Sequence, residues 1–559
     1  MMKEEILKLL KSSGIQATEE KIEIPPNPEM GDYAFPCFEL AKVLKKNPNQ
    51  IAEETVNKLK VWETSLIERV ESKGAYINFF LNWEKISEKL LKEIISDKKY
   101  GASDFGKRKK VMIEHTQPNT NKPQHIGHGR NSVLGDSLVR IMRYAGYKVF
   151  SVTYWGDIGS QQAKAILGYK MWGQDKKPDI KPDHFIGKFY VMYNEKYPED
   201  KEQPKVREFL QNWEKGDKKT LELWKKVTSW VLEGFHETID RLGVKLDIEL
   251  AESQFEKDSK KIIDVLLKKK IAFKSPEGAV VVDLEKYGLP SYIVLRSDET
   301  VLYSTKDLSL AVHKIQKYKL DKSIYVVGAE QKLYFEQVFK TLELLGEKGG
   351  FCHLVYGLVN LPEGKMSSRL GKVVLLDDVI DKVVDLAAKE IEKRNSGMKE
   401  KEKKSTAEKI GIGAMKYALL KVSPEKDIVF DWDKILDFEG DTGPYIQYAY
   451  TRCNSILKKA KKTKSKIKSI RLTEHERNLL KVLSRFPEVV VNSAKDMRPH
   501  NICNYANEVA TKFNNFYQFC PVLKAEGNEK KFRLALVQAT KNVLENSLDL
   551  IGIRVPEKM

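Results

Sequence analysis

The chain has 559 residues, 41% of them hydrophobic, and carries 97 Lys and Arg against 79 Asp and Glu. This composition excludes a disordered chain, and the length is too great for one core, so we expect three to four domains. No run of about 18 apolar residues suggests a membrane span, and the start does not resemble a secretory signal. The net charge of +18 favours an anionic partner without identifying it.

The five cysteines, at 37, 352, 453, 503 and 520, form no C-x-x-C pair. That spacing argues against a structural metal site and favours free thiols in a reducing cytoplasm. We therefore expect a cytoplasmic protein without a protein-bound structural metal.

The first part of the chain, residues 1–105, is predicted to be a small α+β domain. Helical patterns occur at 3–13, 36–44 and 50–60. A strand is expected at 74–81, where aromatic and β-branched residues follow a glycine.

A βαβ unit opens the next part, residues 106–405. A short apolar strand is predicted at 109–114, a long amphipathic helix at 126–145 and a second strand at 147–154. Such a unit predicts a parallel sheet. A charged, mainly helical insertion is expected at about 162–290. Further strand patterns lie at 278–283, 292–296, 324–327 and 353–359.

From about 405 to the end every pattern is helical, so residues 406–559 are predicted to form an all-α bundle. Within it, residues 456–471 contain eight Lys or Arg and no acid. This run suits phosphate contacts, although it equally fits a solvated loop.

The densest chemical signal is His125-Ile126-Gly127-His128, which follows a predicted strand and loop and begins a helix. A helix start attracts phosphate through its free N–H groups, and glycine lets the backbone approach a ligand. Two histidines there can donate to oxygens whose charge grows during a reaction. A second signal, Lys365-Met366-Ser367-Ser368, is a basic loop between glycines that could follow a triphosphate.

Together, these two motifs resemble the H-x-G-H and K-M-S-K signatures of class I aminoacyl-tRNA synthetases. Longer runs resemble the arginyl-tRNA synthetases in particular. They are 114–119 (EHTQPN), 156–161 (GDIGSQ), 441–448 (DTGPYIQY) and 550–559 (LIGIRVPEKM). The resemblance reaches from about residue 27 to the last residue. It implies a Rossmann-type catalytic domain, so the expected fold class is α/β.

One departure from the class pattern is Ser368, which stands where the class has its second lysine. In arginyl enzymes that lack this lysine, a lysine ahead of the first signature is thought to replace it. The resemblance therefore assigns the phosphate work to Lys122 and Lys365, with His125 and His128 as the other catalytic groups. ATP would contact His125, Gly127, His128, Lys365, Met366, Ser367 and Ser368.

A site for arginine needs carboxylates and amide oxygens, because guanidinium is planar, charged and rich in donors. The resemblance supplies such a set. It consists of Glu114, Asn119, Tyr303, Asp307 and Gln331. The tyrosine and Asp307 are four residues apart, so a helical turn would place them on one face. Taken singly, each also fits ordinary packing.

The resemblance also implies two surfaces for tRNA. Tyr445, Tyr448 and Arg452 share one face of a predicted helix and would meet the anticodon loop, together with Tyr517 and Met559. Tyr76 and Asn78 alternate on the 74–81 strand and would contact a D-loop base. A packed core stripe explains the same spacings.

The sequence thus predicts an enzyme that activates L-arginine with ATP and Mg²⁺ and transfers it to the 3′ end of its tRNA. Activation is expected to require bound tRNA, and the chain is expected to be a monomer that does not bind membranes. Two alternatives remain: a nucleotidyltransferase, which would not explain the helical C-terminal part, and a non-catalytic tRNA-binding relative, which would not need H-x-G-H.

Overall fold

The computed structural model describes residues 2–59, 61, 64, 66–198, 204–360, 374–394, 397–432, 434–460 and 467–559. Its residues cluster into two compact units. Unit 1 comprises Met1–Tyr100, Cys453–Arg485 and Thr511–Val543, and unit 2 comprises Gly101–Arg452, Phe486–Ala510 and Leu544–Met559. The helices of the C-terminal third are therefore shared between the units. The predicted domain boundaries at 105/106 and 405/406 stay predictions.

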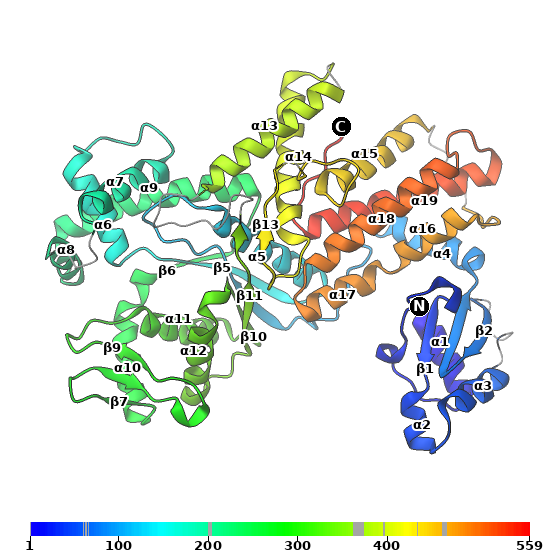
Figure 1. Cartoon of the computed structure of the whole chain (residues 1–559), viewed down its shortest axis with the longest axis horizontal. Helices are drawn as coiled ribbons and strands as arrows, with labels where there is room; N and C mark the ends of the chain where they lie inside the picture. The colour runs from blue at the N-terminus through cyan, green and yellow to red at the C-terminus, as the bar shows by residue number, and fades with distance from the viewer. Residues whose placement is uncertain are drawn as a thin grey trace. The chain divides into compact units, whose positions relative to one another are not determined.

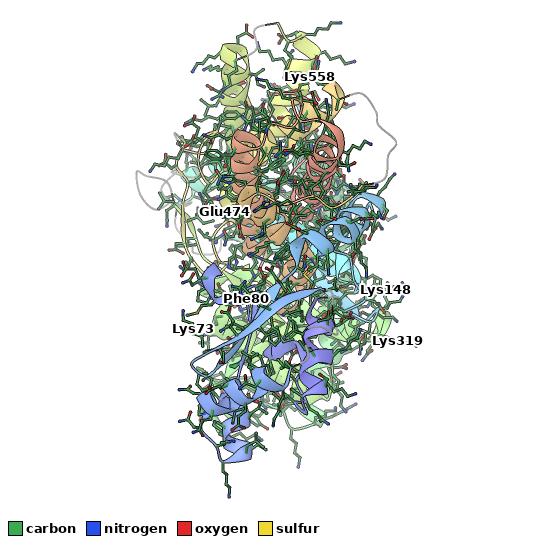
Figure 2. All side chains as sticks on the ribbon, turned by 90° about the vertical axis from the view of Figure 1, so that its right-hand side faces the viewer. Lys73, Phe80, Lys148, Lys319, Glu474 and Lys558 are labelled. Carbon is green, nitrogen blue, oxygen red and sulfur yellow. The ribbon has the colours of Figure 1, made fainter. Side chains whose placement is uncertain are left out.

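The N-terminal segment of unit 1 folds around an antiparallel sheet of order β1-β3-β2, formed by Tyr33–Pro36, Tyr76–Leu81 and Ile67–Lys73. Along β3 the residues Ile77, Phe79 and Leu81 are buried, as expected for a strand with one core face. Figure 2 labels Lys73 on β2 and Phe80 on β3 of this hairpin. The helices of this segment are α1 (Met2–Ser12), α2 (Phe38–Leu44), α3 (Pro48–Lys58) and α4 (Trp83–Ser96).

The centre of unit 2 is a five-stranded parallel sheet of order β11-β10-β4-β5-β6. Its strands are Phe351–Tyr356, Lys322–Gly328, Lys110–Glu114, Lys148–Trp155 and Ile248–Ala251. Helix α5 (Ile126–Tyr144) crosses from β4 to β5, which confirms the predicted βαβ unit. The strand order reverses between β4 and β10, and ligands bind at such a reversal in open α/β sheets.

The segment between β5 and β6 is helical, as expected, and contains α6 (Ser160–Trp172), α7 (Pro182–Lys196), α8 (Pro204–Glu214) and α9 (Lys218–Leu242). After β6, a small antiparallel sheet of β7 (Ala272–Lys274), β8 (Val280–Val282) and β9 (Tyr292–Leu295) shares one apolar cluster with its neighbouring helices. Those helices are α10 (Glu256–Lys268), α11 (Tyr303–Tyr318) and α12 (Lys332–Leu345), visible beside the strands in Figure 1.

The remaining helices are α13 (Leu376–Arg394), α14 (Glu400–Leu420), α15 (Gly443–Lys459), α16 (Glu474–Ser484), α17 (Phe486–Asp496), α18 (His500–Phe519) and α19 (Gly527–Leu550). Helices α13 and α14 pack along each other (Figure 1). The prediction that everything after 405 is helical is wrong at β13 (Ile428–Val429), which pairs in parallel with β12 (Val359–Asn360). A two-residue strand is too short to show a period in the sequence. Within the described ranges, no helix combines the length and apolarity needed to cross a membrane.

Candidate active site

A cavity of about 510 Å³ lies at the carboxyl ends of the parallel strands, where the strand order reverses. Strands β4, β5, β10 and β11, the start of α5 and one residue of α11 all contribute to its lining. Seven residues predicted from the sequence line it. They are Glu114, Asn119, His125, Gly127, His128, Asp307 and Gln331.

The two histidines of the first motif are held by the first turn of α5. His125 is the N-cap residue, and its Nδ1 accepts a hydrogen bond from the Gly127 N–H at 3.1 Å. His128 Nδ1 accepts from the His125 N–H at 3.2 Å, and the two rings stack at 3.8 Å. Because each Nδ1 accepts from a backbone N–H, each neutral ring carries its proton on Nε2.

Burial keeps both rings neutral at physiological pH. It lowers the pKa of His125 to about 4 and the pKa of His128 well below its usual value. The charge of Lys122 lowers both pKa values further. The start of α5 thus offers two neutral Nε2–H donors beside a nearby cation, which suits a phosphate whose charge grows.

The loop after β4 is fixed by contacts with the helix that follows it. Thr116 adopts a left-handed conformation, φ +58°, and its N–H donates to Asn131 Oδ1 at 2.5 Å. His115 is fully buried between Thr116 and Ser151, with hydrogen bonds of 2.8 Å to both hydroxyls. Burial lowers the pKa of His115 to about 4, so this histidine supports the loop as a neutral core group.

Glu114, predicted to face a guanidinium, is already paired on one side. Lys314 Nζ lies 2.5 Å from Glu114 Oε2, and both side chains are buried. The same ammonium lies 4.0 Å from the ring centroid of Tyr325. One carboxylate oxygen of Glu114 is therefore engaged by Lys314, and the residue also lines the cavity.

Asp307 has a different environment, because its partner is a neutral donor. The Tyr334 hydroxyl donates to Asp307 Oδ2 at 2.5 Å. Burial raises the pKa of Asp307 to about 7, against the smaller lowering effect of that hydrogen bond. Tyr303 is 62% exposed and does not line the cavity, although its ring lies 5.2 Å from that of Tyr334.

A third carboxylate in the cavity was not predicted from the sequence. Glu252 follows β6, a strand that the sequence did not predict, and lines the cavity beside Asp307. Lys306 bridges Glu252 and Glu256 at 3.1 Å each. Lys306 therefore pairs with these two glutamates and not with Asp307, its neighbour in the sequence. Glu114 and Glu252 are paired with lysines, whereas Asp307 is the one of these three carboxylates without an ion pair among the described residues.

Two further lining residues hold buried polar atoms without a partner in the described structure. They are Gln117 Oε1 and the Tyr154 hydroxyl. Buried polar atoms are almost always hydrogen-bonded, so unpaired ones in a cavity point to a ligand. Their positions after β4 and at the end of β5 are the only sequence signal that could have identified them.

The second motif lies outside the described residues, so Lys365, Met366, Ser367 and Ser368 stay predictions. A separate cluster of Asp183, His184 and Asp377 has metal-ligand chemistry. However, Lys181 Nζ lies 3.0 Å from Asp183 Oδ1 and 2.9 Å from Asp377 Oδ2. An ammonium thus already occupies the position that a metal ion would take.

The predicted anticodon residues of α15 share a half-buried face, whereas Ile446, Ala449 and Tyr450 on the other side are buried. The Arg452 guanidinium lies 4.7 Å from the Tyr448 ring, which meets Phe438 edge-on at 6.4 Å. In the same unit, Met559 and Phe438 pack against the same apolar cluster. Tyr517, which belongs to unit 1, is 43% exposed.

On β3 the two predicted contacts differ in exposure. Tyr76 is half-buried and meets Phe38 edge-on at 5.5 Å, whereas Asn78 is only 3% exposed. Phe38 is 48% exposed and was not identified from the sequence. A base on this surface would therefore reach the two aromatic rings more easily than the amide.

Three family models match this chain, and together they identify the class of protein. Residues 89–432 match the family model described as tRNA synthetases class I (R), catalytic domain. Residues 446–559 match the DALR anticodon binding domain, and residues 1–81 match the arginyl tRNA synthetase N terminal domain. The sheet order and the cavity with its H-x-G-H helix are thus those of a class I aminoacyl-tRNA synthetase.

Similar proteins show to which family within this class the chain belongs. The arginine–tRNA ligase of Clostridium perfringens is 39% identical over 553 residues, covering 98% of this chain and 97% of that ligase. The ligase of Halothermothrix orenii is 37% identical over 98% of this chain and 96% of its own length. The Thermus thermophilus arginyl-tRNA synthetase structure matches with a TM-score of 0.87 and 30% identity, covering 100% of this chain and 99% of its own. The chain belongs to the arginyl-tRNA synthetase family.

Proposed function

We propose that this protein activates L-arginine with ATP and transfers the arginyl group to the 3′-terminal adenosine of its tRNA, releasing AMP and pyrophosphate. One observation carries the proposal. The same cavity joins a phosphate-directed helix start, with His125 and His128, to carboxylates suited to a guanidinium. This arrangement suits a reaction between an arginine carboxylate and the α-phosphorus of ATP.

In this proposal the arginine side chain binds among Glu114, Glu252 and Asp307, and Asp307 is the one of the three without an ion pair among the described residues. Asn119 and Gln331 line the same cavity and would hold the α-amino end. Tyr303 would contribute through Tyr334, whose ring lies 5.2 Å from its own and whose hydroxyl donates to Asp307. Lysine carries one charge but no planar fork, so it would leave buried acceptors unpaired.

ATP would bind along the start of α5, with its phosphates facing the Nε2–H groups of His125 and His128. Gly127 lets the backbone approach, and Lys122 and Lys365 would hold the leaving pyrophosphate. Mg²⁺ would arrive with the ATP phosphates, which are its usual ligands in such sites. No step needs a covalent enzyme intermediate, because positioning and charge stabilisation are sufficient.

The tRNA would contact the half-buried face of α15 through Tyr445, Tyr448 and Arg452, with Met559 nearby, and Tyr517 and the Tyr76 strand through unit 1. An aromatic and arginine surface suits bases splayed from a loop. We also propose that the enzyme acts in the cytoplasm as a monomer; the free cysteines are consistent with a reducing compartment.

Charging of total tRNA with each radiolabelled amino acid tests the proposal. We expect incorporation of arginine alone, dependent on ATP and divalent magnesium. Salt-sensitive tRNA binding without any charging would contradict it and favour the non-catalytic relative.

A further inference from the structure

A buried arginine on α5 stands apart from the residues considered so far. Arg130 follows His128 by two residues, and its side chain is 1% exposed. Its Nη1 donates to the carbonyl oxygens of Gly357 and Leu358 at 2.5 and 3.3 Å. Its Nη2 donates to those of Pro424 and Lys426 at 3.0 and 2.8 Å.

All four of these acceptors are backbone carbonyls, and they come from two segments far apart in the sequence. Burying a guanidinium is costly, and its position is retained only where several acceptors converge on it. Burial lowers the pKa of Arg130 to about 10, so the group still carries its charge at neutral pH. An apolar side chain at this buried position would not need the four carbonyl acceptors.

One of the two segments is a wall of the cavity. Residues 357–360 line it, together with His125 and His128 from the helix that carries Arg130. The second segment, 424–428, supports this wall from behind. Leu358 N–H donates to Asp427 Oδ1 at 2.7 Å, and Ile428 N–H donates to Leu358 O at 2.8 Å.

The contact between the two segments is too close for a side chain at Gly357. A Cβ there would lie 2.6 Å from Asp427 Oδ1 and 2.6 Å from the Lys426 carbonyl carbon. The wall therefore rests directly on the 424–428 backbone, and Arg130 holds both segments through one rigid guanidinium.

We propose that Arg130 is a positioning residue for ATP. It fixes the distance between the phosphate-directed start of α5 and the wall at 357–360. The proposal rests on the proposed function, because it assumes that ATP occupies this end of the cavity. The proposal predicts different effects on the two substrates. Loss of Arg130 shifts the wall and weakens the binding of ATP. The binding of arginine is unaffected, because Glu114 on β4 and Asp307 on α11 keep their own supports.

The test compares Arg130→Met, which removes all donors, with Arg130→Lys, which keeps the charge but has a different geometry. Arg533→Met is the matched control. Arg533 is also buried, at 7% exposure, and binds Glu476 Oε1 at 2.8 Å and Pro521 O at 3.1 Å within unit 1. The measurements are KM for ATP, KM for arginine and kcat of tRNA charging at saturating tRNA, with Tm for each variant.

We expect Arg130→Met to raise the KM for ATP about tenfold or more while the KM for arginine changes less than about twofold. Arg130→Lys should fall between this variant and the wild type. Arg533→Met should lower Tm without changing the KM for ATP. Equal rises in both KM values for Arg130→Met, or none in either, would overturn the proposal.

Asp427→Ala keeps the proposal testable if Arg130→Met does not fold. Asp427 is exposed and accepts from the Leu358 N–H, so Tm should stay unchanged and the KM for ATP should rise about threefold. An unchanged KM would contradict the proposed role of the wall. ATP binding by calorimetry, measured on the same proteins, distinguishes failure of this inference from failure of the proposed function, because it does not require tRNA charging.

Discussion

The chemistry at residue level depends on two neutral histidines. His125 and His128 both use Nδ1 to accept from backbone N–H groups of their own helix turn. Burial keeps the pKa of each far below neutrality. Their role is therefore to donate from Nε2–H to a developing negative charge, without supplying a positive charge of their own.

Two substitutions of His128 distinguish its role as an Nε2–H donor from its role in capping the helix. His128→Asn keeps a short oxygen that can accept from the His125 N–H but removes the Nε2–H donor. His128→Ala removes both. Both variants should lower the activation rate by roughly 10²–10³-fold, by analogy with losing one oxyanion donor. Their tRNA binding should be nearly unchanged.

Only His128→Ala should also lose cap stabilisation, on the order of 1 kcal/mol, seen as a lower Tm. Single-turnover activation and thermal unfolding measure the two effects. A wild-type activation rate in His128→Asn would remove His128 from the chemistry.

Asp307 makes arginine binding depend on pH. Its pKa is raised to about 7 by burial and by the nearby charges of Glu114 and Glu252, while Tyr334 and Lys314 act in the opposite direction. A guanidinium binds the ionised carboxyl, so binding weakens as pH falls through 7. The apparent KM for arginine should rise about tenfold between pH 8 and pH 6, as expected for one group titrating midway.

Asp307→Asn is the control for this pH effect. It should raise the KM for arginine at every pH and flatten its pH dependence in this range. A KM that stays pH-independent in the wild type would show that Asp307 is already ionised at pH 6 or does not contact the substrate.

At the level of single elements, helix α11 organises the charges of the arginine pocket. It carries Asp307 together with Lys306 and Lys314, the counter-ions of Glu252 and Glu114. The helix thus supplies one carboxylate, which accepts from the Tyr334 hydroxyl, and pairs two others with lysines. Of these three carboxylates, Asp307 is therefore the one that we expect to meet the guanidinium charge.

Substitutions of the buried pair Glu114 and Lys314 should have strongly non-additive effects on the free energy of unfolding. Lys314→Met leaves a buried carboxylate without its cation, which costs about 3–5 kcal/mol in comparable sites. Adding Glu114→Gln removes the stranded charge, so the double variant should recover most of the lost Tm. Thermal unfolding of the four proteins of the cycle measures the coupling, and additive losses would contradict a direct ion pair.

Helix α15 is the element that we expect to meet the anticodon loop. Tyr448→Ala should weaken tRNA binding about tenfold, because stacking on one aromatic ring contributes about 1–3 kcal/mol. Tyr448→Phe should bind nearly as the wild type, and Tyr287→Ala, on a distant exposed tyrosine, should not change binding. The KM for arginine should stay constant throughout. Equal tRNA affinity for Tyr448→Ala and wild type would remove this face from the interface.

The elements that could be predicted from the sequence were those with a clear period. Strands β4 and β5 and helix α5 have regular apolar patterns and lie within about two residues of their predicted positions. Strand β6 was missed inside a charged segment, and with it Glu252, which depends on that strand for its place. Strand β13 is only two residues long.

The ion pairs of the site were not predictable for a different reason. Lys314 and Lys306 lie in a helix whose charges look solvent-exposed in the sequence, and burial becomes apparent only when α11 packs on the sheet. Arg130 likewise shows no special pattern beyond its place after the H-x-G-H motif. Its role depends on carbonyls more than 200 residues away, which no local pattern encodes.

At the scale of the whole molecule, the proposed reaction brings three substrates together on one chain. The cavity of unit 2 combines groups proposed for arginine and ATP, and half-buried or exposed aromatic residues proposed for RNA occur in both units. The net charge of +18 suits a polyanion, so tRNA binding should weaken as salt rises. The proposed function requires that arginine, and no other amino acid, is activated in that cavity.

ATP–pyrophosphate exchange with each amino acid, with and without total tRNA, tests this claim most directly. We predict exchange with arginine alone, and only when tRNA is present. Exchange with another amino acid would contradict the assignment of the carboxylate pocket. No exchange with any amino acid, despite tRNA binding, would contradict the activation chemistry as a whole.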